Sequence, residues 1–261
     1  MINLSQCLFC KSQIKPYWSK ARLWQCQHCL LIFRNPFPEP PDLNRFYTKG
    51  WAEPEANISE TGTTDLLLAR KYVKRLTHEL NRPNLKGLKI LEFGAGKGDL
   101  LKALREMGAE AVGIEPYGLD HIQKLGLPVY PSLENLPADL IFDGVISLQV
   151  IEHLPAPWDD LKKLSTRLKT GGWCYFSTPN IRGLNARLLR SGWREAKKEA
   201  HIVFFSPVSL KRLLAALDLS PSKRLRWLLI YHLHPIRILM NFFLQLFLLD
   251  GELRFLAWKK F

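Results

Sequence analysis

Apolar and polar residues follow two different spacings along this chain, and the two spacings alternate. Short apolar runs predict buried strands, whereas apolar residues three or four positions apart predict the helices between them. The predicted strands lie near residues 88–93, 111–115, 127–130, 140–147, 173–178, 225–231 and 252–259. Strands that alternate with helices favour an α/β fold with a largely parallel sheet.

Three helical segments are indicated by the same spacing. Residues 63–80 carry apolar side chains among basic ones and predict a helix before the first strand. Pro207 suits the first turn of a helix, because no N–H is needed there, and leucines at helical spacing follow it. Residues 235–249 are almost all apolar. Since a bilayer span needs about 20 residues, this stretch is too short to cross alone. It predicts a buried helix, a dimer face or an interfacial helix on anionic lipid.

The segment 89–101 is typical of a buried strand, a glycine turn and the start of a helix. Because glycine has no Cβ, Gly94, Gly96 and Gly98 can take positive φ and let a ligand approach the backbone closely. Glu115 closes the next strand, where a carboxylate can accept both hydroxyls of a ribose. The unit therefore predicts a site for an adenosine-type ligand.

Two ligands compete for such a site, NAD and S-adenosylmethionine. The phosphate-binding sequence of NAD proteins is G-x-G-x-x-G, and here the third glycine comes one residue too early. The shorter spacing favours the methyl donor.

Two later segments, 142–154 and 168–180, extend the pattern, the first with a Glu-His-Leu ending and the second with a Pro-Asn exit. With the glycine turn and the strand that ends at Glu115, they resemble class I S-adenosylmethionine-dependent methyltransferases, in particular bacterial members of types 11 and 23. The resemblance covers most of the chain. It implies a Rossmann-like seven-stranded sheet with helices on both faces, in the order 3-2-1-4-5-7-6 and with an antiparallel last strand.

The same resemblance implies where S-adenosylmethionine binds. The acid on the first strand and the glycine loop hold the methionine end, Glu115 holds the ribose, and the residues after the fourth strand line the floor near the sulfonium. Ser132 stands where the family frequently has an acid for the adenine amino group. The implied cofactor-binding residues are Glu92, Gly94, Ala95, Gly96, Gly98, Glu115, Ser132, Gln149 and Val150.

A general base is needed only if the methyl acceptor must lose a proton, and two histidines are candidates. His153 follows Glu152 after the fourth strand, and in the family this histidine more often packs and caps the following helix. His201 precedes the helix that walls the acceptor pocket in related enzymes, which favours a catalytic role. Its alternative role is a hydrogen bond to the basic loop 180–199, which lies where the family has its substrate lid.

Four cysteines in two C-x-x-C pairs predict a zinc ribbon. The predicted ligands are Cys7, Cys10, Cys26 and Cys29. Four thiolates leave no open position on the metal, so this Zn²⁺ is expected to be structural. Two disulfides or a redox pair are the alternatives, disfavoured without a secretory signal or a thioredoxin-like unit. His28 is expected to be solvated, and Cys174 to fill the place of a small buried hydrophobe.

The expected organisation is a ribbon at 1–35, a proline-rich linker at 36–60 and a methyltransferase domain at 61–261, with a lid insertion at 180–200. The expected location is the cytoplasm, with peripheral contact at the inner membrane face as an addition. This order of segments is similar to that of bacterial methyltransferases that modify sugars, glycans or lipids.

Three functions follow as hypotheses. The first is methyl transfer to a small molecule, a sugar or a lipid-linked glycan. The net charge of +13 raises RNA as an alternative acceptor, although the basic residues gather beside the apolar C-terminal segment. The third is a non-catalytic methyltransferase-like scaffold, which would have no need of the glycine turn.

Overall fold

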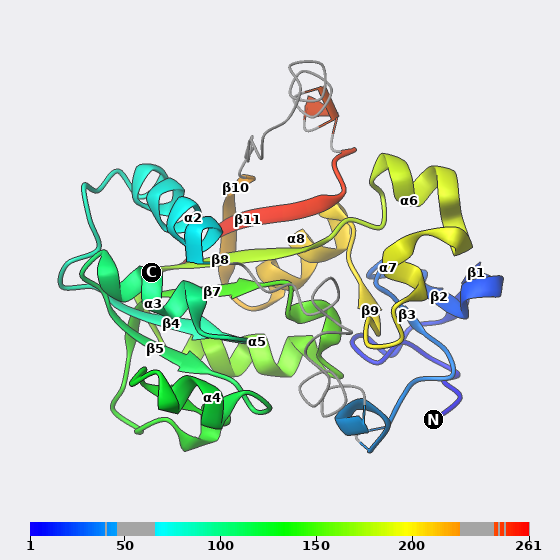
Figure 1. Cartoon of the computed structure of the whole chain (residues 1–261). Helices are drawn as coiled ribbons and strands as arrows, with labels where there is room; N and C mark the ends of the chain where they lie inside the picture. Colours follow the sequence, from blue (N-terminus) through cyan, green and yellow to red (C-terminus); the bar gives the residue numbers. More distant parts are fainter. Residues whose placement is uncertain (40, 46–65, 225–242, 245, 248, 261) are drawn as a thin grey trace.

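The computed structural model describes residues 1–39, 41–45, 66–224, 243–244, 246–247, 249 and 250–260 (Figure 1). Most of the predicted apolar helix 235–249 lies outside these residues, as does the predicted strand 225–231. Within the described residues, no helix combines the length and apolarity that a membrane crossing requires.

A seven-stranded sheet forms the centre of the molecule. Its order is β10-β11-β8-β7-β4-β5-β6, and β11 runs antiparallel to both of its neighbours. Numbered along the chain, this is the predicted 3-2-1-4-5-7-6 order, which is confirmed. The strands are β4 Lys89–Phe93, β5 Glu110–Ile114, β6 Val129–Tyr130, β7 Phe142–Leu148, β8 Leu168–Pro179, β10 Leu219–Arg224 and β11 Glu252–Lys259.

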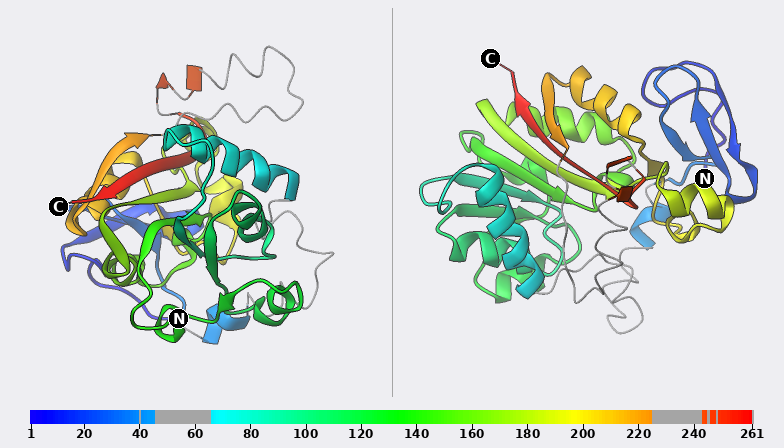
Figure 2. Two further views of the ribbon diagram at one scale, coloured as in Figure 1. Left: turned by 90° about the vertical axis from the view of Figure 1, so that its left-hand side faces the viewer. Right: turned by 90° about the horizontal axis from the view of Figure 1, so that it is seen from above.

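Helices cover both faces of this sheet, as predicted (Figures 1 and 2). Side chains alternate along β4, so that Ile90 packs in one core with α2 and α3, while Leu91 and Phe93 pack in the other with α5 and α8. The helices are α2 Leu66–Glu79, α3 Asp99–Glu106, α4 Leu119–Lys124, α5 Pro157–Thr166, α6 Leu184–Leu189, α7 Arg194–Lys197 and α8 Pro207–Ala216. Single 3-10 turns are η1 Ser19–Ala21, η2 Leu133–Asn135, η3 Ile151–His153 and η4 Arg190–Gly192.

Two strand boundaries differ from the prediction. The sixth strand begins at Leu219, before its predicted start at 225, because Asp218, at φ +56°, turns the chain directly from the end of α8 into β10. The fifth strand begins at Leu168, which pairs with Phe142, although the sequence suggested a helix end there. A register shift within this pairing separates the early residues of β8 from the apolar part that the pattern marked.

A second sheet joins the N-terminal segment to the rest of the molecule. Its order is β1-β2-β3-β9, made of β1 Ile14–Trp18, β2 Leu23–Cys26, β3 Ile32–Arg34 and β9 Val203–Phe204. The pairing between β3 and β9 is antiparallel and matches Ile32 with Phe204. Ile32 and Phe204 are buried. The N-terminal strands therefore lie beside α6 and α7, at the opposite end of the molecule from α2 and α3 (Figures 1 and 2).

Candidate functional site

The glycine loop after β4 takes the predicted positive φ angles, +85° at Gly94, +54° at Gly96 and +85° at Gly98. A Cβ on Gly94 would lie 2.3 Å from Val150 Cγ2, so only glycine lets this turn approach the end of β7. A Cβ on Gly96 would meet no heavy atom within 4 Å. The loop therefore presents bare backbone at Gly96, the geometry that a ligand approaching the main chain needs.

Glu115 reaches this loop from the end of β5. Its Oε2 accepts the Gly96 N–H at 2.9 Å, and its Oε1 accepts the N–H groups of Tyr117 at 3.0 Å and Gly118 at 3.3 Å. Burial raises the pKa of Glu115, and the three N–H groups oppose that rise. The fold thus brings the predicted ribose-binding acid and the predicted glycine loop into direct contact.

Glu92 is the second acid of this region and comes from the last part of β4. It is buried, and in the part of the chain that the structure describes its Oε2 has no hydrogen-bond partner. Burial, followed by the charges of Glu115 and Asp99, raises its pKa well above the usual value. A buried carboxyl oxygen without a partner suits a ligand that brings a cationic or N–H group, such as the ammonium of a methionine moiety.

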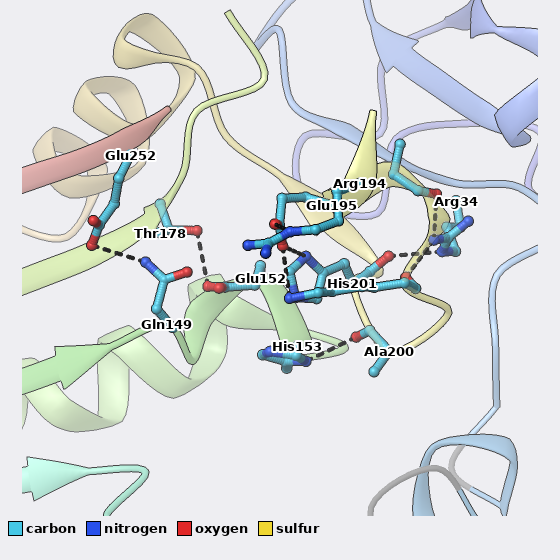
Figure 3. Close-up of polar contacts among 12 residues, drawn as sticks. Arg34, Gln149, Glu152, His153, Thr178, Arg194, Glu195, Ala200, His201 and Glu252 are labelled. Carbon is cyan, nitrogen blue, oxygen red and sulfur yellow. Dashed lines mark hydrogen bonds and ion pairs between the residues drawn. The ribbon is translucent and has the colours of Figure 1, made fainter. Parts of the chain in front are cut away.

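The turn after β7 supplies two further predicted residues. Gln149 has a φ of +56°, and its backbone N–H donates to Ser177 O at 2.9 Å. Its side-chain Nε2 donates to Glu252 Oε1 at 3.0 Å, across to β11 (Figure 3). These two contacts hold the left-handed turn that presses Val150 against Gly94.

Ser132, the residue predicted near the adenine, follows β6 and begins the turn η2. Its Oγ donates to Asn135 Oδ1 at 2.8 Å. The predicted cofactor residues therefore all lie at the carboxyl ends of β4, β5, β6 and β7, where open α/β sheets bind ligands.

A polar cluster lies beyond the turn at Gln149, and it contains Glu152, His153 and His201 (Figure 3). One ligand atom from each of the three lies within 4.8 Å of the others. Glu152 Oε2 accepts a hydrogen bond from Thr178 Oγ1 at 2.9 Å. Burial raises the pKa of Glu152 to about 8, so this carboxyl is mostly protonated at neutral pH.

The two imidazole rings of the cluster pack edge to face, with centroids 4.6 Å apart. His153 Nδ1 lies 3.0 Å from Ala200 O, and because a carbonyl only accepts, Nδ1 carries the proton. His201 is 2% exposed, and its Nδ1 lies 3.5 Å from Glu195 Oε2. Burial lowers the pKa of His153 to about 4 and lowers that of His201 as well. Both rings are therefore neutral at physiological pH.

The ring of His153 packs against the 194–204 segment, and its capping of the following helix stays a prediction. Helix α5 begins after Ala156, and no side-chain hydrogen bond from this N-cap residue caps it. His201 Nδ1 lies near Glu195 of the loop 180–199, but it has no hydrogen-bond partner among the described residues, so the hydrogen bond of its alternative role stays a prediction. Sequence reasoning missed Glu195 and Arg34. Arg34 stands in no local motif, since it binds backbone carbonyls more than 160 residues away. Glu195 pairs with the nearby side chains of Arg194, Lys198 and His201, but these residues form no motif that sequence reasoning recognised.

The four predicted zinc ligands come together in the N-terminal ribbon. Their sulfur atoms all lie within 4.8 Å of one another, with Cys7–Cys29 at 3.6 Å and Cys10–Cys26 at 3.4 Å. A tetrahedral Zn²⁺ with bonds of about 2.3 Å separates its sulfurs by roughly 3.8 Å, so the donor set fits zinc. The sulfurs are too far apart for disulfides, and all four cysteines are free.

Two other residues in question behave as expected. His28 is exposed and stands outside the sulfur cluster. Cys174 is fully buried, and burial raises the pKa of its thiol to about 12, which makes it an inert part of the core.

Comparison with known proteins decides the family. A family profile described as a methyltransferase domain matches residues 67–221, more than half of the chain. The chain belongs to the methyltransferase domain family. The resemblance to class I methyltransferases is thereby confirmed.

Curated relatives share part of this methyltransferase. Over 117 residues it is 32% identical to the ubiquinone biosynthesis O-methyltransferase of Chromobacterium violaceum, covering 41% of this chain and 50% of the relative. The protein of that name from Burkholderia multivorans is 31% identical over 155 residues, covering 54% and 64%. The chain spans about half the length of several of the curated relatives that it matches.

Solved structures share the fold of this methyltransferase. A SAM-dependent methyltransferase from Thermotoga maritima aligns with a TM-score of 0.57 at 18% identity, over 83% of this chain and 99% of the other. A 1,6-didemethyltoxoflavin N1-methyltransferase from Burkholderia thailandensis aligns with a TM-score of 0.56 at 16% identity, over 95% and 100%. At these identities the likeness is one of fold.

Proposed function

We propose that this chain binds S-adenosylmethionine at the glycine loop and transfers its methyl group to an oxygen of a small-molecule acceptor. The observation that carries the proposal is the arrangement at the ends of β4 and β5. Bare backbone at Gly96 lies against Glu115, and the buried Glu92 carboxyl keeps one oxygen without a partner among the described residues. An adenosine ligand with a charged amino-acid end matches all three features.

S-adenosylmethionine supplies a methyl group already activated on a sulfonium, with a neutral thioether as the leaving group. The chain's own task is therefore alignment, which by itself lowers a barrier by several kcal/mol. Glu92 would pair with the amino-acid end, Glu115 with the ribose, and Ser132 with the adenine. Gln149 and Val150 would form the floor, because their turn is held rigidly by Ser177 and Glu252.

An oxygen acceptor must lose its proton as the methyl arrives, and we assign that proton to the cluster of Glu152, His153 and His201. A proton acceptor works best when its pKa lies near the operating pH. Glu152, with a pKa of about 8, is mostly protonated at neutral pH, so its deprotonated fraction is the acceptor, and that fraction grows as the pH rises towards 8. The two neutral rings lie within reach of this carboxyl. We therefore assign the proton to this cluster and do not assign the base to either histidine alone.

The acceptor class follows from the relatives and from one surface feature. The curated relatives are named for O-methylation in ubiquinone biosynthesis, which supports a small-molecule acceptor. Leu188 and Leu189 are exposed on α6, beside Arg187 and Arg190. An apolar and basic surface suits an amphiphilic or anionic acceptor, so a sugar or lipid-linked glycan belongs to the same proposal. RNA and a non-catalytic scaffold remain as outcomes of the test.

The first experiment is titration calorimetry of the full chain with S-adenosylmethionine. We expect saturable binding in the wild type and binding weakened by at least about tenfold in Glu115→Ala. Glu110→Ala is the matched control, since Glu110 is exposed at the opposite end of the same strand, and its affinity should equal that of the wild type. NAD, titrated alongside, should not bind. Absence of S-adenosylmethionine binding, or equal affinity in Glu115→Ala, would contradict the proposal.

The acceptor is then sought with methyl-labelled S-adenosylmethionine and three classes of substrate. These are small phenols, lipid-linked or free sugars, and RNA transcripts. Label in either of the first two supports the proposal, and loss of that label in Glu152→Gln supports the role of the cluster. Label in RNA alone, or in none of the classes despite cofactor binding, favours the alternatives.

A further inference from the structure

Arg34, the last residue of β3, holds the segment that carries His201. Its Nε donates to His201 O at 2.7 Å, and its Nη2 donates to Lys198 O at 2.6 Å and to Ala196 O at 3.0 Å (Figure 3). The side chain is only partly exposed, and burial lowers its pKa to about 10. One guanidinium from the N-terminal ribbon thus binds three carbonyls of a single stretch of backbone more than 160 residues away.

The backbone of the ribbon fixes the next residues of the same segment. The Arg34 N–H donates to Ile202 O at 3.0 Å, and the Ile202 N–H donates to the carbonyl oxygen of Glu152, also at 3.0 Å. The β3–β9 pairing continues this contact through Phe33 and Val203. A single residue, Ile202, therefore stands between the ribbon and the backbone of the proton-accepting cluster.

Contacts from this segment orient the two imidazoles. Ala200 O accepts the hydrogen bond from His153 Nδ1, and Glu195 lies against His201 Nδ1. His201 itself packs edge to face on His153. A small shift of this segment would move the Ala200 carbonyl and the Glu195 carboxylate, and both rings would turn with them.

We propose that Arg34 is a positioning residue for the proposed acceptor site, and that the cysteine ribbon is one wall of that site. This inference rests on the proposed function for its meaning, because only then do the rings of His153 and His201 handle a proton. Arginine suits the task since its planar fork presents five N–H donors at fixed angles on three nitrogens, whereas the three N–H donors of lysine share one nitrogen at the end of a flexible stem.

The test uses the full chain labelled with ¹⁵N on its histidines, and reads the imidazole nitrogen resonances by NMR. Signals of the two rings are assigned with His153→Gln and His201→Gln. In the wild type, His153 should show one fixed tautomer with its proton on Nδ1. In Arg34→Met, we expect the Nδ1 and Nε2 resonances of His153 to move towards each other as tautomers mix, and those of His201 to shift or broaden.

Two further variants separate positioning from general destabilisation. Arg34→Lys keeps the charge and should show the same change in reduced form; it decides the question if Arg34→Met does not fold. Arg212→Met removes another arginine that bonds the ribbon, at His28 O, from the exposed side of α8, and should leave both rings unchanged. Zinc content and thermal stability are measured on every variant.

Calorimetry with S-adenosylmethionine distinguishes failure of the positioning role of Arg34 from failure of the proposed function. Affinity should stay within about twofold of the wild type in every Arg34 variant, because the cofactor residues lie on other strands. Unchanged histidine signals in folded Arg34→Met and Arg34→Lys would overturn the positioning role while leaving the proposed function intact. A wild type that binds no S-adenosylmethionine would overturn the proposed function, whatever the histidines show.

Discussion

The two ends of the candidate site are built in different ways. The cofactor end is nearly contiguous, since Glu92, the glycine loop and Glu115 come from one β-turn-α-β unit and contact one another within 30 residues. The acceptor end takes single residues from distant segments, namely Arg34, Glu152 and His201. A site made of one local unit can be recognised from spacing, whereas a site assembled by tertiary packing cannot.

The nature of the contacts differs in the same sense. At the cofactor end, a side chain from the local unit accepts backbone N–H groups of that unit. At the acceptor end, Arg34 of the ribbon donates to the backbone carbonyls of Ala196 and Lys198, and the side chains of these two residues take no part in the contact. The acceptor end should therefore depend on the integrity of the ribbon, and the cofactor end should not. Four predictions test this difference.

The largest effect is expected from loss of a ribbon ligand. Cys29→Ser should abolish stoichiometric zinc and unfold the ribbon, because structural Zn²⁺ contributes about 10 kcal/mol or more to such a fold. Hydrogen exchange should then rise across residues 194–204 and stay unchanged in the glycine loop. Cys174→Ala is the control, since Cys174 is buried in the other sheet and should cost about 1 kcal/mol without loss of zinc. Unaltered exchange at 194–204 in metal-free protein would remove the contrast between the two ends.

The second prediction concerns pH and the buried carboxyl of the acceptor end. The pKa of Glu152 is about 8 in the folded chain, above its ordinary value of 4.5, so the folded state holds this proton more tightly than the unfolded state. The stabilisation that the protonated Glu152 carboxyl gives is complete below about pH 4.5 and is lost as the pH rises through 8. Relative to Glu152→Gln, the wild type should lose up to about 4 kcal/mol of unfolding free energy over that range.

Urea unfolding at a series of pH values measures this difference. The two histidines, whose folded pKa values are lowered, contribute the opposite slope below their ordinary pKa of 6.5, but they do so in both proteins and cancel. Glu92 and Glu115 cancel in the same way. Parallel curves for the wild type and Glu152→Gln would show that the Glu152 carboxyl is not held protonated.

The third prediction compares two glycines within the cofactor end. Gly94→Ala should destabilise the fold by about 2 to 3 kcal/mol, because its Cβ would lie 2.3 Å from Val150 Cγ2 and the φ is positive. Gly96→Ala meets open space and should cost only the left-handed backbone, about 1 kcal/mol. Both should weaken S-adenosylmethionine at least about tenfold by calorimetry. Full affinity in Gly96→Ala would mean that the ligand does not approach this backbone.

The smallest effect is expected where the two ends meet. Gln149→Gly relieves the cost of a left-handed residue, about 1 kcal/mol, and removes the bond to Glu252, which is worth a similar amount. The net change in stability by chemical unfolding should therefore stay within about 1 kcal/mol. Glu252→Gln keeps the shape and the acceptor oxygen for Gln149 but removes the charge that pairs with Arg254, so it reports that ion pair separately from the Gln149 bond. A loss of stability well above about 1 kcal/mol in Gln149→Gly would show that the Gln149 side chain has a further role.

Most of the fold and the cofactor end could be predicted from the sequence, because the signals for them are local. The apolar run of β4, the glycine turn and Glu115 each depend on neighbours a few residues away. The sixth strand was placed too late, since the left-handed turn at Asp218 that starts it has no signal in residue spacing. His153 was expected to cap a helix, and only tertiary packing shows that its Nδ1–H donates to Ala200 O. Arg34 lay near the end of the predicted ribbon, and nothing in its neighbours indicated that its side chain binds the backbone of His201.

The pairing of β3 with β9 also orders events during synthesis. Strands β1 to β3 leave the ribosome before β9, and the edge of β3 that pairs with β9 has no partner until residues 203–204 emerge, some 170 residues later. Until then, the unpaired N–H and C=O groups of this short edge can pair with a strand of another chain, and such pairing leads to domain swapping. A metal bound early would keep that edge small and fixed in shape while the rest of the protein is made.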